Sequence, residues 1–174
     1  MSAELAARVH RAAHLTGTFR LRSGQTSTEY FDKYLFESDP RLLRDVAEGL
    51  AGLVPDGVDA LAGLELGGVP VATVLSQVTG LPALFVRKRA KDYGTCRLAE
   101  GGDVEGRHLL VVEDVVTTGG QVLESCAELR ALGATVEVVL CVIDREAGGA
   151  AAFAEQGLAL RALFTMSELN AAGA

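Results

Sequence analysis

The sequence predicts an α/β fold with a mostly parallel sheet flanked by helices. Apolar runs of strand length recur at 58–64, 82–86, 109–112, 135–143 and 158–164. Helical patterns stand between most of these runs, and alternating strands and helices are typical of a parallel sheet. The run at 135–143 is rich in valine, as expected of a strand covered on both faces. No repeat, linker or low-complexity tract interrupts the chain, so we expect one domain over residues 1–174.

The N-terminal elements follow from residue spacing and turn chemistry. Residues 3–14 are amphipathic and predict a helix. Phe19 and Leu21 alternate with arginines as in a half-exposed strand, and Ser23-Gly24 predicts a turn. The aromatic residues of 29–36 predict the returning strand of a hairpin. By residue pattern alone, packed aromatics are the expectation for this hairpin.

Capping residues and glycines delimit the remaining helices. Asp39-Pro40 is typical of a helix start, with the aspartate as cap and the proline at the first helical position. Glycines that stop a helix follow at Gly52, Gly80 and Gly133. The expected helices are 40–51, 68–80, 121–132 and 150–156, with a last one after a capping box at 165–168.

Composition limits the classes of function. The chain has 174 residues, 49% of them hydrophobic, which suits one domain with a real core. It has neither an apolar stretch of about 18 residues nor the apolar segment of a signal peptide, so we expect a cytoplasmic protein outside the membrane. A net charge of −7 argues against broad nucleic-acid binding. The odd number of cysteines and their spacing predict reduced thiols, with Cys126 and Cys141 in the core and Cys96 in a polar loop.

The main candidate site follows the apolar run at 109–112. Two carboxylates, Glu113 and Asp114, precede a loop of hydroxyls and glycines that opens into the helix at 121–132. Glycines allow close approach of the backbone, and the free N–H groups of the first helical turn can bind an anion. Bare carboxylates repel phosphate, so they are expected to face sugar hydroxyls, a hydrated divalent cation or a developing positive charge. The pattern predicts a site for a phosphorylated sugar, and the alternative is an ordinary turn whose threonine caps the helix.

A second candidate is the basic concentration at 87–91. Arg87, Lys88 and Lys91 precede a polar, glycine-containing segment at 95–105. Cations at the root of an exposed loop are typical of a lid that neutralises pyrophosphate as it leaves. The alternative is a solvated surface.

These motifs occur in an order that resembles the orotate phosphoribosyltransferases, members of the type I phosphoribosyltransferase family. Residues 111–120 resemble the family's phosphoribosyl-pyrophosphate (PRPP) motif, with Glu113 where an aspartate is more common. Residues 87–94 resemble its catalytic loop, with Tyr93 in place of the usual histidine. Residues 19–32 resemble its N-terminal hood, which we expect at about 1–38.

The family loop that touches pyrophosphate differs in this chain. Many members carry tyrosine and lysine there, whereas this sequence has Leu66 and Gly67. Backbone N–H groups of Gly67 and Gly68 are therefore the expected pyrophosphate contacts, and a simple tight turn is the alternative.

The resemblance implies a role for each matching residue. Glu113, Asp114 and Lys91 would be catalytic. PRPP would contact Arg87, Lys88, Lys91, Tyr93, Glu113, Asp114, Val115, Val116, Thr117, Thr118, Gly119, Gly120 and Gln121. Orotate would contact Arg22, Tyr30, Phe31, Thr117 and Arg145, and the arginines suit an anion. The resemblance also implies Mg²⁺ held mainly by PRPP and water, and a homodimer whose active site is shared across the interface.

The implied reaction transfers ribose 5-phosphate from PRPP to orotate, giving orotidine 5′-phosphate and pyrophosphate in pyrimidine synthesis. Two alternatives remain at this stage. One is the same chemistry on another base, such as a purine. The other is a non-catalytic regulator that senses PRPP and binds nucleic acid or a protein partner, against which the acidic charge and the basic loop count.

Overall fold

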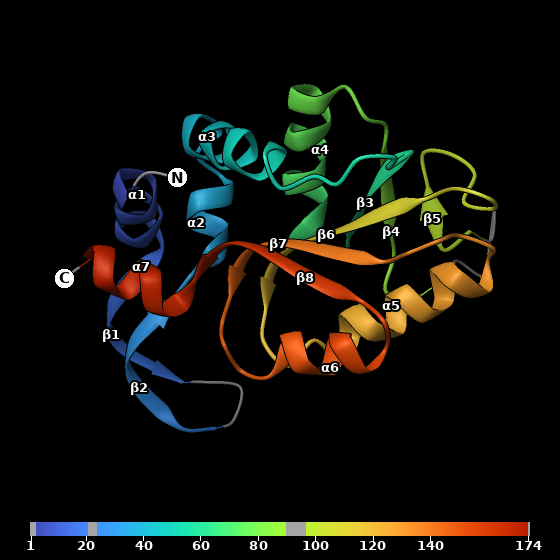
Figure 1. Ribbon diagram of the computed structural model, residues 1–174. Coiled ribbons are helices and arrows are strands. Elements are labelled where there is room, and N and C mark those ends of the chain that lie inside the picture. The colour runs from blue at the N-terminus through green and yellow to red at the C-terminus, as the bar shows by residue number, and fades with distance from the viewer. Residues whose placement is uncertain (1–2, 21–23, 90–96, 174) are drawn as a thin grey trace.

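The central sheet has the predicted α/β organisation. The computed structural model describes residues 3–20, 24–89 and 97–173 (Figure 1). Over this part of the chain, six strands form one sheet in the order β5-β4-β3-β6-β7-β8. Neighbouring strands run parallel except β4 and β5, which are antiparallel. The strands are β3 (Ala60–Leu64), β4 (Ala83–Val86), β5 (Ala99–Glu100), β6 (Leu109–Val116), β7 (Val138–Asp144) and β8 (Ala159–Thr165).

Helices cover both faces of this sheet. In Figure 1, α3 and α4 lie on one face and α5 and α6 on the other. Side chains of β6 alternate between the faces, because Leu110 and Val112 belong to one buried cluster and Leu109 and Val111 to the other. The helices here are α3 (Pro40–Ala51), α4 (Gly68–Thr79), α5 (Gly120–Ala131) and α6 (Gly149–Glu155). Both faces of β6 are therefore dry up to the point where its acidic residues begin.

The N-terminal part of the chain forms a separate small hairpin with helices beside it. The strands β1 (His14–Arg20) and β2 (Thr26–Phe31) pair antiparallel. The returning strand predicted at 29–36 is wrong in its second half, because Lys33–Glu37 is the helix α2. The Asp32 side chain caps this helix by accepting a hydrogen bond from the Tyr34 N–H at 3.1 Å. Aromatic residues alone suggested a strand, whereas the cap and the buried Phe36 select a helix.

Two terminal helices close the structure, and both were expected. The helix α1 (Ala3–Ala13) packs against α7 (Met166–Gly173), which brings the described ends of the chain together (Figure 1). The capping box before α7 is confirmed: Thr165 N–H donates to Glu168 Oε2 at 2.8 Å, and Glu168 N–H donates to Thr165 Oγ1 at 3.2 Å. The cap at Asp39 is likewise confirmed.

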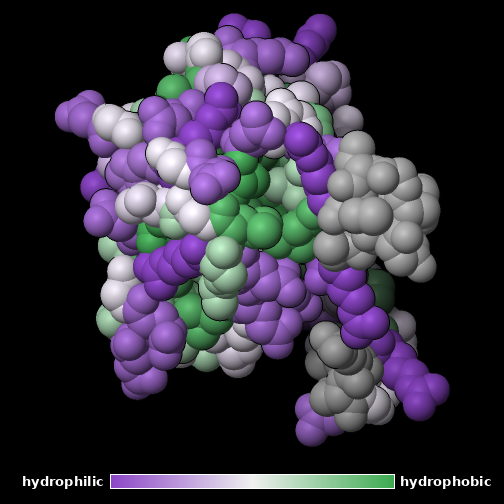
Figure 2. Space-filling view, turned by 90° about the vertical axis from the view of Figure 1, so that its right-hand side faces the viewer, coloured by the Kyte–Doolittle hydropathy of each residue, from purple (hydrophilic) through white to green (hydrophobic). Residues whose placement is uncertain are grey.

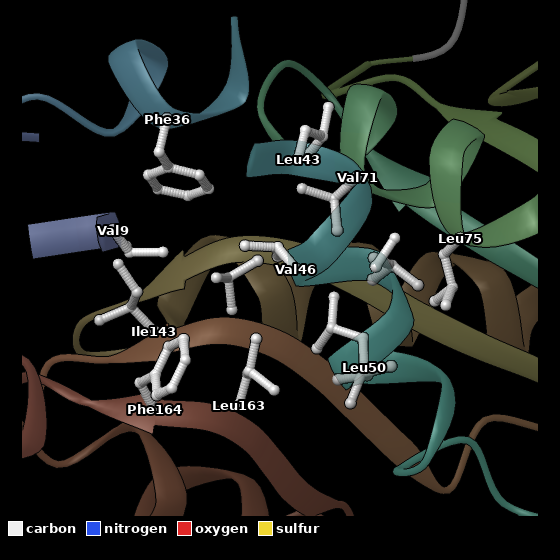
Figure 3. Packing of buried hydrophobic residues seen from close by; sticks show 14 of the residues in the cluster. Val9, Phe36, Leu43, Val46, Leu50, Val71, Leu75, Ile143, Leu163 and Phe164 are labelled. Atoms are coloured by element: carbon white, nitrogen blue, oxygen red, sulfur yellow. The ribbon is translucent and has the colours of Figure 1, made fainter. Parts of the chain in front are cut away.

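The larger apolar cluster joins the terminal elements to the sheet. Figure 3 shows Phe36 pointing from α2 into the cluster that contains Val9, Val46 and Ile143. Cys126 and Cys141 are buried as predicted, and Cys96 lies outside the described residues. Within the described ranges, no helix combines the length and the apolar character that a membrane crossing requires.

Element boundaries differ from the predictions at a few ends. The strand predicted at 135–143 begins only at Val138, because Thr135 makes an isolated bridge to His108. The strand predicted at 58–64 begins at Ala60. Glu113, Asp114 and Arg145 stay at or near the carboxyl ends of their strands despite these shifts.

Candidate active site

The two predicted acids lie near the carboxyl end of β6, at the centre of the sheet. Asp114 is fully buried, whereas Glu113 is partly exposed. The Val115 N–H donates to Asp114 Oδ1 at 2.5 Å, and the Asp114 N–H donates to Glu113 Oε1 at 2.9 Å. The backbone of β6 thus fixes both carboxyl groups against their own strand.

A lysine from the hood supplies the counter-charge of Asp114. Lys33, the first residue of α2, forms an ion pair from its Nζ to Asp114 Oδ2. Burial alone would raise the pKa of Asp114, but hydrogen bonds with Glu113 and Lys33 hold it below its usual range. Burial would lower the pKa of Lys33, but the bond and attraction to Asp114 raise it. Both groups are therefore charged at neutral pH.

Two further carboxyl groups share this cluster and are kept neutral. Glu37 in α2 is 7% exposed, and its carboxyl group faces that of Asp114. Burial, and then the charge of Asp114, raise the pKa of Glu37 to about 8. Burial and the same charge raise the pKa of Glu113 well above its usual range. Burial thus favours the neutral form of Glu37 and Glu113, whereas Lys33 favours the ionised form of Asp114.

The loop after β3 lies against Asp114, which explains its glycines. A Cβ atom at Gly67 would collide with the Asp114 carboxyl group, and one at Gly68 would collide with the backbone of Val112. Gly67 is also the N-terminal cap residue of α4, so the first turn of that helix lies beside the carboxylate. At this loop, where the sequence departs from the family pattern, the backbone therefore packs closely against Asp114. A cis peptide bond joins Glu65 and Leu66 just before it.

The predicted phosphate loop joins β6 to α5. Thr117 and Thr118 are exposed, Val116 is buried, and Val115 packs against the larger cluster. Gly119 has a φ of 77°, and a Cβ atom there would lie 2.8 Å from Phe153 Cζ. Both observations require glycine at this position.

The helix after this loop presents its first turn to solvent. Gly120 and Gln121 are exposed at its start, and the Gln121 side chain donates to Glu124 at 3.2 Å. The first N–H groups of this 12-residue helix have no partner within it, as at any helix N-terminus. The loop can therefore bind a phosphate through backbone N–H groups and hydroxyls.

Arg145 comes close to this loop through the neighbouring strand. Its N–H donates to the Val116 carbonyl at 2.8 Å, and its side chain is exposed. The structure thus brings Arg145 to the same edge of the sheet as Thr117.

The described part of the basic segment begins at the end of β4. Arg87 Nε lies 3.7 Å from Glu100 Oε1, and the Lys88 N–H donates to Glu65 Oε2 at 3.1 Å while its side chain is exposed. Lys91 and Tyr93 lie outside the described residues.

The predicted aromatic pair of the hood is divided between surface and core. Tyr30 is 44% exposed, and its ring stacks on Phe19 with centroids 5.5 Å apart. Phe31 is partly buried and packs against the larger apolar cluster. Arg22 lies outside the described residues.

Sequence reasoning missed Lys33 and Glu37, although both lie in the acidic cluster. Lys33 fell within the strand expected at 29–36 and Glu37 just beyond its end, and neither position gave a reason to place these residues near β6. Reading Asp32 as a helix cap would have placed Lys33 in the first helical turn, one turn before Glu37. The approach of this helix to β6 is a tertiary contact that local pattern does not encode.

Comparisons with known proteins agree with this geometry. Residues 36–152 match the phosphoribosyl transferase domain family. The chain is 58% identical over 172 residues to an orotate phosphoribosyltransferase of Nocardioides sp., covering 99% of this chain and 96% of the relative. It is 44% identical to that of Methanocella arvoryzae, covering 88% of this chain and 87% of the relative.

Solved structures give the same result. The orotate phosphoribosyltransferase of Mycobacterium tuberculosis in complex with inorganic phosphate superposes with a TM-score of 0.86 at 32% identity, covering 97% of each chain. The same enzyme in complex with PRPP gives a TM-score of 0.83 at 32% identity, covering 97% of this chain and 98% of that one. An adenine phosphoribosyltransferase of Leishmania tarentolae, at 14% identity, shares the fold alone. The chain belongs to the orotate phosphoribosyltransferase family of phosphoribosyltransferases.

Proposed function

We propose that this chain transfers the ribose 5-phosphate group of PRPP to a ring nitrogen of orotate, releasing pyrophosphate, as a step of pyrimidine (UMP) synthesis. The observation that carries this function is the placement of Glu113 and the buried, charged Asp114 beside an exposed loop that opens into α5. That arrangement pairs a site for a phosphate with a site for an electron-poor sugar. The names of the curated relatives support the choice of orotate as acceptor.

The acid pair acts on the ribose. The ring nitrogen of orotate can react already ionised, so the difficult step is the departure of pyrophosphate while positive charge grows on the ribose ring. A carboxylate fixed before the reaction stabilises that charge without reorganisation. Asp114 has this property because β6 and Lys33 hold it in place. Glu113, partly exposed beside it, accepts hydrogen bonds from the ribose hydroxyls in this proposal.

The loop from Thr117 to Gln121 binds the 5′-phosphate in this proposal. The exposed hydroxyls of Thr117 and Thr118 and the N–H groups of Gly120 and Gln121 are its donors. Val115 and Val116 complete the contact surface, and Gly119 gives the loop its left-handed turn.

Cations stabilise the leaving group. Arg87 and Lys88 stand at the root of the basic segment, and we assign Lys91 and Tyr93 to the same task from the sequence motif. Mg²⁺ prefers oxygen ligands, and among the described residues no group of three or more His, Cys, Asp or Glu side chains could hold a metal. In this proposal the ion is held mainly by PRPP and water. When bound, Mg²⁺ would neutralise charge developing on pyrophosphate.

Arg145 and the hood bind the acceptor in this proposal. A guanidinium can bind the carboxylate of orotate with two parallel hydrogen bonds, and the exposed Arg145 side chain lies at the same edge of the sheet as Thr117. Tyr30 and Phe31 would flank the ring, and Arg22 would add positive charge.

We also propose a homodimer that shares its active sites. Leu66 is 62% exposed and Phe85 37% exposed, and both line a hollow next to Arg87. The side of the molecule on which β5 lies carries a patch of apolar residues bordered by hydrophilic ones (Figure 2). Such exposed apolar surface suits burial against a second copy. The proposal further includes a single domain with its hood at about 1–38, a cytoplasmic location, and no nucleic-acid or membrane partner.

Turnover assays test the function. Purified protein with PRPP, Mg²⁺ and a panel of bases should consume orotate and leave purines unchanged, measured by ultraviolet absorbance. Asp114→Asn should reduce turnover by a factor on the order of 10², comparable with loss of one preorganised electrostatic group. Purine turnover would select the alternative acceptor, and near-normal activity of the variant would show that the acid pair is misassigned.

A mixed dimer tests the shared site. Lys91→Ala and Asp114→Asn chains should each have strongly reduced turnover alone, and mixing them should restore one intact site if the loop acts across the interface. The two variants kept as separate homodimers are the control. No recovery in the mixture, with dimers confirmed by sedimentation, would refute the shared site.

A further inference from the structure

Lys33 lies in a rigidly held segment of the hood. The Asp32 N–H donates to the Ala13 carbonyl at 2.8 Å, and the Asp32 side chain caps α2. Phe36 is fully buried and anchors the other end of the helix in the apolar cluster (Figure 3). The packing of α2 against the core therefore determines where Lys33 lies. It is not a loosely held surface residue.

The cluster around Asp114 is otherwise acidic. Glu113 lies beside it on β6, and Glu37 and Asp32 come from the hood; Tyr34 also lies next to Lys33, whose Nζ is 5.3 Å from the Tyr34 ring centroid. Among the described residues, Lys33 supplies the ion pair that Asp114 makes. A buried carboxylate without a cation would take up a proton near neutral pH.

We propose that Lys33 is a positioning residue that holds the Asp114 carboxylate, charged and correctly oriented, for the ribose of the donor. The inference rests on the proposed function, because it assumes that PRPP binds at Asp114. Lys33 is 30% exposed, so the pair lies at the wall of the site and not in the deep core. The same short segment carries Tyr30 and Phe31, so one part of the hood would serve both substrates.

The alternative is a salt bridge that only stabilises the fold. The two roles differ in what they do to pH dependence. If Lys33 keeps Asp114 ionised, its removal raises the pKa of Asp114, and as the pH is lowered activity is lost at a higher pH than in the unsubstituted protein. A bridge that only stabilises the fold changes the melting temperature and leaves the pH profile of the folded enzyme unchanged.

The experiment uses three substitutions and one matched control. Lys33→Met removes the charge, Lys33→Gln keeps a hydrogen-bond donor without charge, and Lys33→Arg keeps the charge. Arg8→Met breaks another ion pair of the N-terminal elements, from Arg8 to Asp45 at 2.6 Å, which joins α1 to α3 outside the site. PRPP affinity with Mg²⁺ is measured by calorimetry, and kcat/KM for PRPP is measured from the lowest pH at which the protein stays folded up to pH 9.

We expect Lys33→Met and Lys33→Gln to weaken PRPP binding at pH 7 by about ten- to hundredfold, the range for losing a hydrogen bond to a charged group. The acidic limb of kcat/KM should move up by about one pH unit or more. Lys33→Arg should restore the profile, and Arg8→Met should match the unsubstituted protein. If Lys33→Met does not fold, Lys33→Gln and Lys33→Arg still provide the comparison.

The proposal is overturned if the uncharged variants bind PRPP within twofold of the unsubstituted protein and keep its pH profile. Failure of the proposed function has a different result. In that case the unsubstituted protein itself would not turn over orotate, whereas a loss of PRPP affinity in the Lys33 variants would still support the positioning role.

Discussion

Glu37→Gln should stabilise the protein at alkaline pH and leave its stability unchanged in acid. The pKa of Glu37 is raised by burial and by Asp114 from 4.5 to about 8, so the folded state holds a proton that the unfolded chain releases. The folded state is therefore favoured fully below pH 4.5, and this stability is lost as the pH rises to about 8. Glutamine resembles the protonated side chain at every pH, so the variant avoids the loss.

The size of this stabilisation follows from the pKa shift of Glu37. At about 1.4 kcal/mol for each pKa unit, the rise from 4.5 to about 8 sets an upper limit of about 5 kcal/mol. The Lys33 side chain beside the cluster is 30% exposed, so water reaches the cluster there and weakens the effect. We therefore expect Glu37→Gln to raise the free energy of unfolding at alkaline pH by about 2 kcal/mol. For a chain of this length that corresponds to about 4–8 °C in the melting temperature.

Thermal unfolding followed by circular dichroism at pH 5 and pH 8.5 measures the effect. Other groups also titrate in this range, so the informative quantity is the difference between variant and unsubstituted protein at each pH. Glu48→Gln is the control, because Glu48 is 52% exposed in a surface pair with Arg44. A difference that is the same at both pH values, or a less stable variant at pH 8.5, would refute the buried protonated Glu37.

Two further predictions concern glycines of the site. Gly67→Ala should lower the free energy of unfolding by about 1–3 kcal/mol and lower kcat/KM, because the new Cβ collides with Asp114. The control is Gly52→Ala, whose nearest neighbour is 3.7 Å away and which should change stability by no more than about 1 kcal/mol. Thermal unfolding and turnover distinguish the two variants. Gly119→Ala should destabilise the protein by about 1–3 kcal/mol more than Gly57→Ala, since both glycines have a φ of 77° but only Gly119 faces Phe153. Equal losses of stability in a denaturant titration would show that Phe153 moves aside without cost.

The sequence was sufficient for the sheet and for the acid pair because both are local. The apolar run before Glu113 defines β6, and the glycines after it define the start of α5, so the order of elements fixes the carboxyl end at which Glu113 and Asp114 lie. Arg145 was also placed correctly at this edge, since β7 is the parallel neighbour of β6. Whether these residues contact the proposed substrates remains a prediction.

The surroundings of Asp114 could not be read from local pattern. Three residues around it come from two distant segments: Lys33 and Glu37 from α2 in the hood, and Gly67 from the loop before α4. From the local sequence alone, each would be interpreted as an ordinary residue: a surface lysine, an exposed acid in a helix and a glycine in a turn. Their common role depends on the approach of α2 and α4 to β6, which is a property of the assembled core.

The loop at Leu66-Gly67, which departs from the family pattern, packs its backbone directly against Asp114. A side chain at residue 67 would occupy the space of the Asp114 carboxyl group, so glycine there is required by the acid and not only by a ligand. The helix N-terminus at α4 and the ammonium of Lys33 then compensate one buried negative charge from two sides. Asp114 can therefore remain ionised although it is buried, as its proposed role beside the ribose ring requires.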